Sequence, residues 1–216
     1  MSFRLPRISS RVRAPLALGL VAGLAAACGT SHTKNEGAKN LENAPELAGE
    51  WRTDCHKLDW LGFSYERQTL KFSLLGDFDR LTTVYTDASC ATSSSSLSEH
   101  GTFSALGASQ STPNATDINF QIAAATVKPD SDDGAKALNA LGYCGVTGWQ
   151  SGGEVDVIGK TCLGRTHAKG EVIFDVYNID QDGKRLKTGK ASLLVDKSDA
   201  NARPTKLDDS LPYAKQ

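Results

Sequence analysis

The stretch "LAGEWRTDC" (Leu47 to Cys55) lies where a polar segment gives way to a patterned, foldable chain. The preceding residues 29–45 ("GTSHTKNEGAKNLENAP") are polar and lack apolar periodicity, which is typical of a flexible tether. Beyond this stretch, apolar and polar residues alternate with a period of two, most clearly where Ile118, Phe120 and Ile122 are separated by polar residues. Such alternation predicts strands with one buried face.

The alternation predicts strands along most of the chain, and a different local pattern predicts one short helix. The strand candidates lie near residues 50–55, 64–74, 78–87, 97–105, 117–127, 154–159, 170–178 and 186–195. The helix is predicted at residues 132–143 ("DDGAKALNALGY"), where aspartates precede the apolar positions and Gly142 ends them. Most connections are short and no alternation of strand and helix appears. The fold class is therefore all-β, as an antiparallel barrel or sandwich.

The N-terminal residues 1–27 have the pattern of an export signal. Four arginines precede an apolar run, residues 14–27, which ends in the sequence "LAAAC" at Cys28. The run is too short to span a membrane and fits a secretory signal peptide. "LAAAC" resembles the lipobox of bacterial lipoproteins, in which the cysteine is diacylated and becomes the mature N-terminus. The alternative is an ordinary secretory signal.

The lipobox resemblance implies a location in the cell. It makes residues 28–45 a lipidated tether and gives the protein the membrane as a partner. The residue directly after Cys28 is Gly29. In bacterial lipoproteins, aspartate at that position is linked with retention in the inner membrane, so glycine there implies the outer membrane. The domain would then lie on the periplasmic face or on the cell surface.

Removal of residues 1–27 from the 216-residue chain leaves 189 residues, enough for one domain with a core, which we place at 46–216. The removed segment carries four of the 24 basic residues and none of the 25 acidic ones, so the mature net charge is −5. This charge argues against nucleic acid as a partner, because phosphate binding needs clustered lysine and arginine.

Four cysteines remain in the mature chain: Cys55, Cys90, Cys144 and Cys162. An even number in an exported chain predicts two disulfides. A zinc site is the alternative, but the chain contains no CxxC pair and the four cysteines are widely spread.

Three short motifs carry a resemblance that covers most of the mature chain. Gly-x-Trp at Gly49 and Trp51, at the start of the first strand, resembles the lipocalins and their calycin relatives. "GxWxxxC", "YTDASC" (85–90) and "RPTKLD" (203–208) followed by Tyr213 are together similar to small bacterial lipoproteins with a lipocalin-like domain. The resemblance implies an up-and-down barrel of about eight strands. It also implies that Gly49, Trp51 and Arg203 plug the closed end, with Arg203 packed over the tryptophan.

An up-and-down strand order favours one of the three possible disulfide pairings. The first strand ends at Cys55, and the third strand ends at Cys90 on the same rim, so these two cysteines should pair. Cys144 and Cys162 bracket a glycine-rich segment that a local bridge would close.

The motifs of common enzymes and metal sites are missing from the sequence. It has no HExxH, GxSxG or GxGxxG pattern, so we predict no catalytic residues, no metal and no cofactor. Residues 178–189 ("NIDQDGKRLKTG") imitate a calcium loop, but Gly189 stands where the bidentate glutamate belongs. An Asp-Gly hairpin turn is the favoured interpretation.

Two tryptophans, Trp60 and Trp149, lie in loops beside cysteines and are candidates for ligand binding, since aromatic side chains commonly line apolar sites. The alternative is that they belong to the core. From these features we expect non-catalytic binding of a small apolar or amphipathic ligand. The alternative function is a structural module that docks to an envelope protein or polymer.

Overall fold

The structure is a computed structural model that describes residues 44–58, 65–190 and 197–216. Its strands are β1 (Gly49–Thr53), β2 (His56–Lys57), β3 (Tyr65–Phe72), β4 (Asp77–Tyr85), β5 (Ser93–Ala108), β6 (Thr116–Pro129), β7 (Val155–Asp156), β8 (Thr161–Cys162), β9 (Arg165–Thr166), β10 (Val172–Ile179), β11 (Arg185–Thr188) and β12 (Tyr213–Lys215). The one α-helix among the described residues is α1 (Asp132–Leu141), and the 3₁₀ turns are η2 (Pro45–Leu47), η3 (Tyr143–Gly145) and η4 (Ala200–Ala202).

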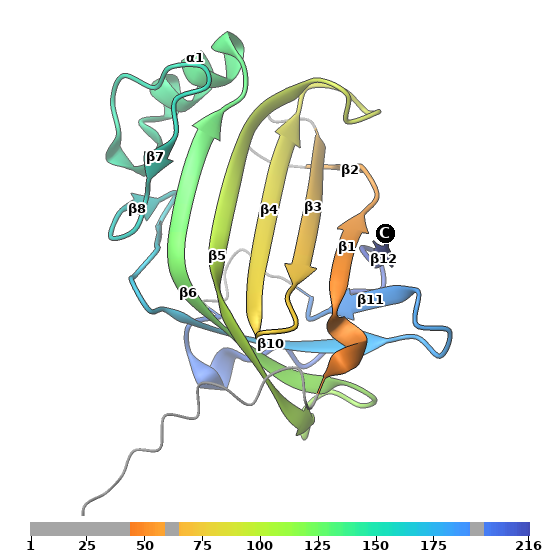
Figure 1. Ribbon diagram of the computed structural model, residues 1–216. Helices are drawn as coiled ribbons and strands as arrows, with labels where there is room; N and C mark the ends of the chain where they lie inside the picture. Colours follow the sequence, from red (N-terminus) through yellow and green to blue (C-terminus); the bar gives the residue numbers. More distant parts are fainter. Residues whose placement is uncertain (1–43, 59–64, 191–196) are drawn as a thin grey trace, which may run out of the picture. The chain divides into compact units, whose positions relative to one another are not determined.

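Eight of the described strands close into an antiparallel barrel in the order β1-β3-β4-β5-β6-β10-β11-β12 (Figure 1). Neighbours in the barrel are neighbours among these strands along the chain, so the strand order is up-and-down. Closure comes from β1, which pairs with β3 on one side and with β12 on the other. The all-β barrel predicted from the sequence is therefore confirmed.

One predicted strand lies outside the barrel wall, and the strand that replaces it was not predicted. The candidate at 154–159 forms only β7, two residues that pair with the end of β6 at Thr126 and Val127. Glycines at 152, 153 and 159 flank it, which limits its length. The missing barrel strand is β12, which has three residues and no readable alternation. The candidate at 186–195 is confirmed only as β11, and residues 191–196 lie outside the described part.

The two ends of the barrel differ. At one end, here called the turn end, η2 precedes β1 and tight turns at 73–76 and 109–115 join β3 to β4 and β5 to β6 (Figure 1, bottom). At the other, the disulfide end, residues 86–92 join β4 to β5 and a long connection, 130–171, runs from β6 to β10. This connection contains α1, the only predicted helix, which is confirmed.

Helix α1 begins and ends as its sequence predicts. The Ser131 hydroxyl accepts a hydrogen bond from the Gly134 N–H at 3.1 Å, which caps the N-terminus. Gly142 ends the helix in the left-handed conformation at φ 56°.

The imitation calcium loop forms a hairpin turn, as favoured from the sequence. It joins β10 to β11, with the Gly183 N–H bonded to the Asp180 carbonyl at 3.0 Å. The Asp180 carboxylate accepts from the Lys184 and Arg185 N–H groups and is thus used within the turn.

Candidate functional site

The tryptophan that opens the barrel is buried at the turn end. Trp51 has no exposed surface, and its indole N–H donates to the Leu47 carbonyl at 2.7 Å. Gly49 adopts φ 114°, a conformation that favours glycine, between η2 and this tryptophan. The cation over the Trp51 ring is Lys215, whose Nζ lies 4.9 Å from the ring centroid.

Arg203 lies elsewhere, which corrects the expectation that it packs over Trp51. Its guanidinium stands 5.3 Å from the Phe174 ring centroid and donates to the Ile118 carbonyl at 3.0 Å. It also pairs with the Asp117 carboxylate at 3.6 Å. Arg203 therefore ties the C-terminal segment to β6 and β10. The reason is topological: β12 pairs with β1, so the lysine of β12 is the cation next to the tryptophan.

Aromatic side chains fill the barrel next to Trp51. The rings of Phe72 and Phe103 meet edge to face at 4.9 Å, and those of Phe78 and Phe120 do so at 4.8 Å. All four residues are at most 4% exposed. Since edge-to-face pairs add to the free energy of burial, this part of the barrel is a packed core rather than an open cavity.

A charged pair faces the interior above these rings. The Arg80 guanidinium donates to Glu99 Oε2 at 3.1 Å, and the two side chains are 16% and 4% exposed. Arg80 also lies over the Phe120 ring, 5.0 Å from its centroid. The sequence contained a signal for this pair, because Arg80 keeps the inward parity of Phe78 on β4 and Glu99 keeps that of Phe103 on β5. Neither residue belongs to a motif that the sequence marks as a site.

His167 reaches the same interior region from the long connection. Its Nδ1 lies 3.9 Å from Glu99 Oε1, which is too far for a hydrogen bond. Within the described residues, both atoms are buried and neither has a hydrogen-bond partner. Burial and then the charge of Arg165 lower the pKa of His167, while the Glu99 carboxylate opposes this shift. The imidazole is therefore neutral near pH 7.

The connection that carries His167 is hydrogen-bonded to β6 along part of its course. The Val157 N–H bonds to the Ala125 carbonyl at 2.9 Å, and Ile122 exchanges backbone hydrogen bonds with Gly170 and Glu171. This stretch lies beside the half of β6 that β10 does not reach. Ala125 stands opposite Glu99 in the β5–β6 ladder, so the bond from Val157 to Ala125 brings the connection to within one strand of Glu99.

Of the two predicted ligand-binding tryptophans, Trp149 is 4% exposed and packs in the core, while Trp60 lies outside the described residues. Asn139 of α1 holds Trp149 in place, since its side-chain oxygen accepts from the Trp149 N–H at 2.9 Å. The Trp149 indole nitrogen is a third buried atom without a partner in the described part of the chain. Its ring lies 6.4 Å from that of Tyr143, whose pKa is raised by burial and then by the Glu99 carboxylate.

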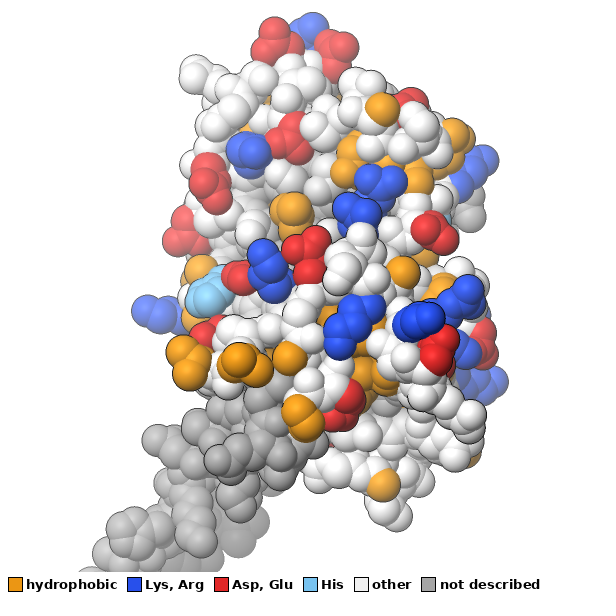
Figure 2. Space-filling view, turned by 45° about the vertical axis from the view of Figure 1, so that its right-hand side comes forward, with side chains coloured by type: hydrophobic (Ala, Val, Ile, Leu, Met, Phe, Trp, Pro, Cys, Tyr) orange, Lys and Arg blue, Asp and Glu red, His pale blue; other side chains and the backbone are white. Residues whose placement is uncertain are grey.

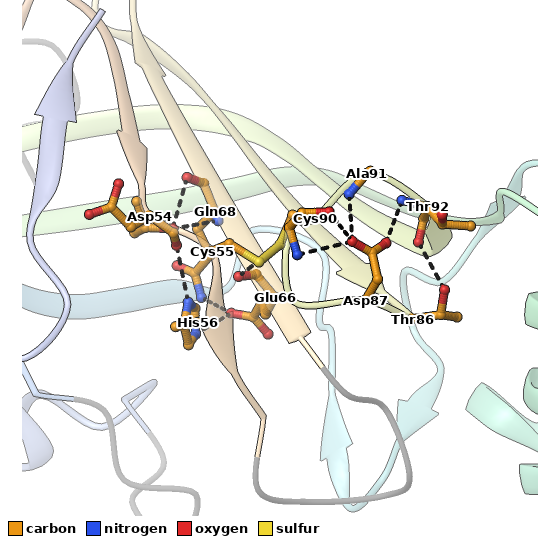
Figure 3. Close-up of a disulfide and its surroundings, with 12 residues drawn as sticks. Asp54, Cys55, His56, Glu66, Gln68, Thr86, Asp87, Cys90, Ala91 and Thr92 are labelled. Atoms are coloured by element: carbon orange, nitrogen blue, oxygen red, sulfur yellow. Dashed lines mark hydrogen bonds and ion pairs between the residues drawn. A yellow bond between two sulfur atoms is a disulfide. The ribbon is translucent and has the colours of Figure 1, made fainter.

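Both predicted disulfides are confirmed. Cys144 and Cys162 join η3 to β8 and close the long connection on itself, with Cα atoms 4.0 Å apart. Cys55 and Cys90, with Cα atoms 5.8 Å apart, join the β1–β2 corner to the β4–β5 turn at the rim (Figure 3).

The turn that presents Cys90 is organised by Asp87, as Figure 3 shows. The Asp87 carboxylate accepts hydrogen bonds from the Ala91 and Thr92 N–H groups and from the Ser89 hydroxyl. The Ser89 hydroxyl contributes most to lowering the pKa of this carboxyl, followed by the backbone of Thr92.

Neither a metal site nor a membrane-spanning helix is found in the described part of the chain. No cluster of three or more His, Cys, Asp or Glu residues there could hold a metal ion. No helix there is both long and apolar enough to cross a membrane. Comparison with protein-family models and with curated proteins found no match for this chain.

Proposed function

We propose that the protein is a lipoprotein of the outer membrane, anchored through acylated Cys28, whose barrel binds a small apolar or amphipathic ligand without catalysis. The "LAAAC" motif at residues 24–28 supports the anchor. The two disulfides support an oxidising compartment outside the cytoplasm.

The observation that carries ligand binding is a change in burial along the inward faces of β3 and β4. On β3, Phe72 and Leu70 are 4% and 1% exposed, whereas Gln68 and Glu66 on the same face are half-buried. On β4, Phe78 is fully buried, whereas Thr82 and Val84 are half-buried. Along these two strands the barrel is filled at the turn end and less buried at the disulfide end, here called the accessible end, and a barrel of this form can hold a ligand.

A pair of tryptophan substitutions tests this role. Leu97 on β5 faces inward beside Thr82, whereas Leu81 on β4 is 41% exposed. Leu97→Trp should fill the accessible end and abolish binding of an apolar fluorescent naphthylamine probe. Leu81→Trp adds the same bulk outside and should leave binding unchanged. Equal binding by both variants would contradict a ligand site inside the barrel.

The lipid anchor has its own test. Wild-type protein should incorporate radioactive fatty acid and fractionate with membranes, and Cys28→Ser should do neither. A wild-type protein that takes up no label would contradict the anchor and leave the barrel's role untouched.

Docking to an envelope protein or polymer is the second candidate function, and exposed leucines at the turn end favour it. Leu74 and Leu75 are 78% and 84% exposed at the β3–β4 turn, and Leu106 is 53% exposed at the end of β5. Figure 2 shows hydrophobic side chains low on the face drawn there. Under this function, a photoreactive residue at position 75 should give a cross-linked adduct in intact cells. The same residue at position 163, where Leu163 is 46% exposed, is the control.

A further inference from the structure

Two polar atoms face each other across the barrel interior without hydrogen-bond partners among the described residues. They are Oε1 of Glu99 and Nδ1 of His167, 3.9 Å apart, on side chains that are 4% and 5% exposed. Buried polar groups are almost always satisfied, so each atom calls for a partner. One oxygen atom placed between them could lie about 2.8 Å from each, a normal hydrogen-bond length.

The charges around this gap are already paired. Arg80 is bound to the other oxygen of Glu99 at 3.1 Å, and Arg165 pairs with Glu171 at 3.7 Å. Tyr143, which also lies in the field of Glu99, carries no charge near pH 7. A ligand that brought a full charge of either sign would leave it buried without a counter-charge, which is costly. The site therefore selects a neutral group.

The two unpartnered atoms also define what that neutral group must do. A carboxylate oxygen only accepts hydrogen bonds, whereas a neutral imidazole nitrogen donates or accepts according to its tautomer. A hydroxyl satisfies both atoms at once. Its proton is donated to Glu99 Oε1, and its oxygen accepts a hydrogen bond from the Nδ1–H of His167. An ester or ketone has no proton to donate to Glu99.

Apolar side chains adjoin the gap on the side of the accessible end. Leu97 and Val127 are paired in the β5–β6 ladder, two residues beyond Glu99 and Ala125 on the same inward face. Leu97 is half-buried and Val127 is 3% exposed. A ligand whose hydroxyl lay at the gap would have its remaining atoms against this apolar wall.

We infer that the ligand of the barrel is a neutral apolar molecule carrying a hydroxyl group, and that this hydroxyl binds between Glu99 and His167. The inference rests on the proposed binding function and names its ligand class. Arg80 acts as a positioning residue, because it holds Oε2 of Glu99 and leaves Oε1 free.

Equilibrium dialysis with radiolabelled 1-decanol and decanoate tests the inference, using purified full chain in one fixed detergent. The two probes share a chain length and differ in head group. The partition of each probe into detergent is measured without protein, and each affinity is corrected for it before the two probes are compared. We expect wild type to bind decanol about tenfold or more tightly than decanoate, the range that one charged hydrogen bond supplies.

Glu99→Gln is the decisive variant because it preserves shape and removes the charge that neutralises Arg80. It should reverse the preference, so that decanoate gains about tenfold and decanol loses affinity. His167→Phe should weaken decanol binding and leave decanoate unchanged. Asp79→Asn is the matched control: its carboxylate is exposed on the outer face of β4, next to Arg80 in sequence, and pairs with His100 at 2.8 Å. It should change neither affinity.

The outcomes separate the two proposals. If wild type binds both probes equally well and Leu97→Trp abolishes both, the binding function stands and the hydroxyl inference is overturned. If no probe binds to wild type, both proposals fall. If Glu99→Gln does not fold, the wild-type preference together with His167→Phe decides the matter.

Discussion

Trp51 is fully buried, and its indole N–H still has an acceptor, in the Leu47 carbonyl. The resemblance of Gly-x-Trp to the lipocalins implied that burial, and the motif could be recognised because it spans only three residues. It could not identify the cation over the ring, since Lys215 lies at the other end of the chain and reaches Trp51 through barrel closure. Local patterns predict which residue is buried, and long-range pairing decides what it touches.

Trp51→Ala should lower the free energy of unfolding by roughly 3–5 kcal/mol, because it leaves a cavity in a packed site. Equilibrium denaturation in guanidinium measures the change. Leu75→Ala, at a residue that is 84% exposed, is the control and should change stability by less than about 0.5 kcal/mol. Equal stability of the two variants would show that Trp51 does not anchor the turn end.

His167 makes the stability of the fold depend on pH. Its pKa is lowered in the folded protein, so the unfolded chain binds the proton more readily. The stabilisation is complete above the ordinary histidine value of about 6.5 and is lost as pH falls below it. Between pH 7.5 and 5.5, the free energy of unfolding should fall more for wild type than for His167→Gln. Leu75→Ala, at a residue that is 84% exposed and does not titrate, should retain the wild-type dependence.

At the scale of elements, alternation of period two predicted the long strands because their inward faces are buried along the barrel. It failed in two ways, by predicting a strand in the barrel where there is none and by missing one that is too short to show a pattern. Residues 154–159 alternate but pair only briefly with β6, and the three residues of β12 are too few for any period. Helix α1 was predictable because both of its ends carry local signals, aspartates in the first turn and a C-terminal glycine, whereas the Ser131 cap was found only in the structure.

Gly134→Ala tests how closely α1 packs on the barrel. In an exposed helix this change is stabilising by roughly 0.5–1 kcal/mol. Here a Cβ would lie 1.9 Å from the Ser94 carbonyl oxygen, so the substitution should destabilise the protein. Thermal unfolding measures the sign. Lys136→Ala, at an exposed position of the same helix, is the control and should change stability little, and a stabilised Gly134→Ala variant would contradict this packing.

At the scale of the molecule, closure by β12 and the polar site inside the barrel were the features hardest to predict. Arg80 and Glu99 stand at inward positions of predicted strands, so parity alone could have marked them. His167 could not be marked in this way, because the connection 130–171 lacks periodicity along its course to β10. Its position follows from backbone bonds to β6 and from the Cys144–Cys162 bridge.

Deletion of residues 213–216 should open the barrel. It removes β12 and leaves the edges of β1 and β11 without partners, and such edges promote association. We expect a lower unfolding midpoint and larger species in analytical ultracentrifugation. Deletion of Gln216 alone should have little effect on either measurement. A monomeric, fully stable 213–216 deletion would show that the barrel does not depend on this strand.

Native mass spectrometry of the protein extracted from its own membrane tests the central claim most directly. The claim predicts a chain that begins at an acylated Cys28 and carries a small non-covalent adduct, neutral and apolar, which denaturation releases. Glu99→Gln protein from the same membrane should lack that adduct, and Asp79→Asn protein should retain it. An acylated chain with no small-molecule adduct in wild type, or with a protein bound instead, would contradict the claim that the barrel is a ligand site.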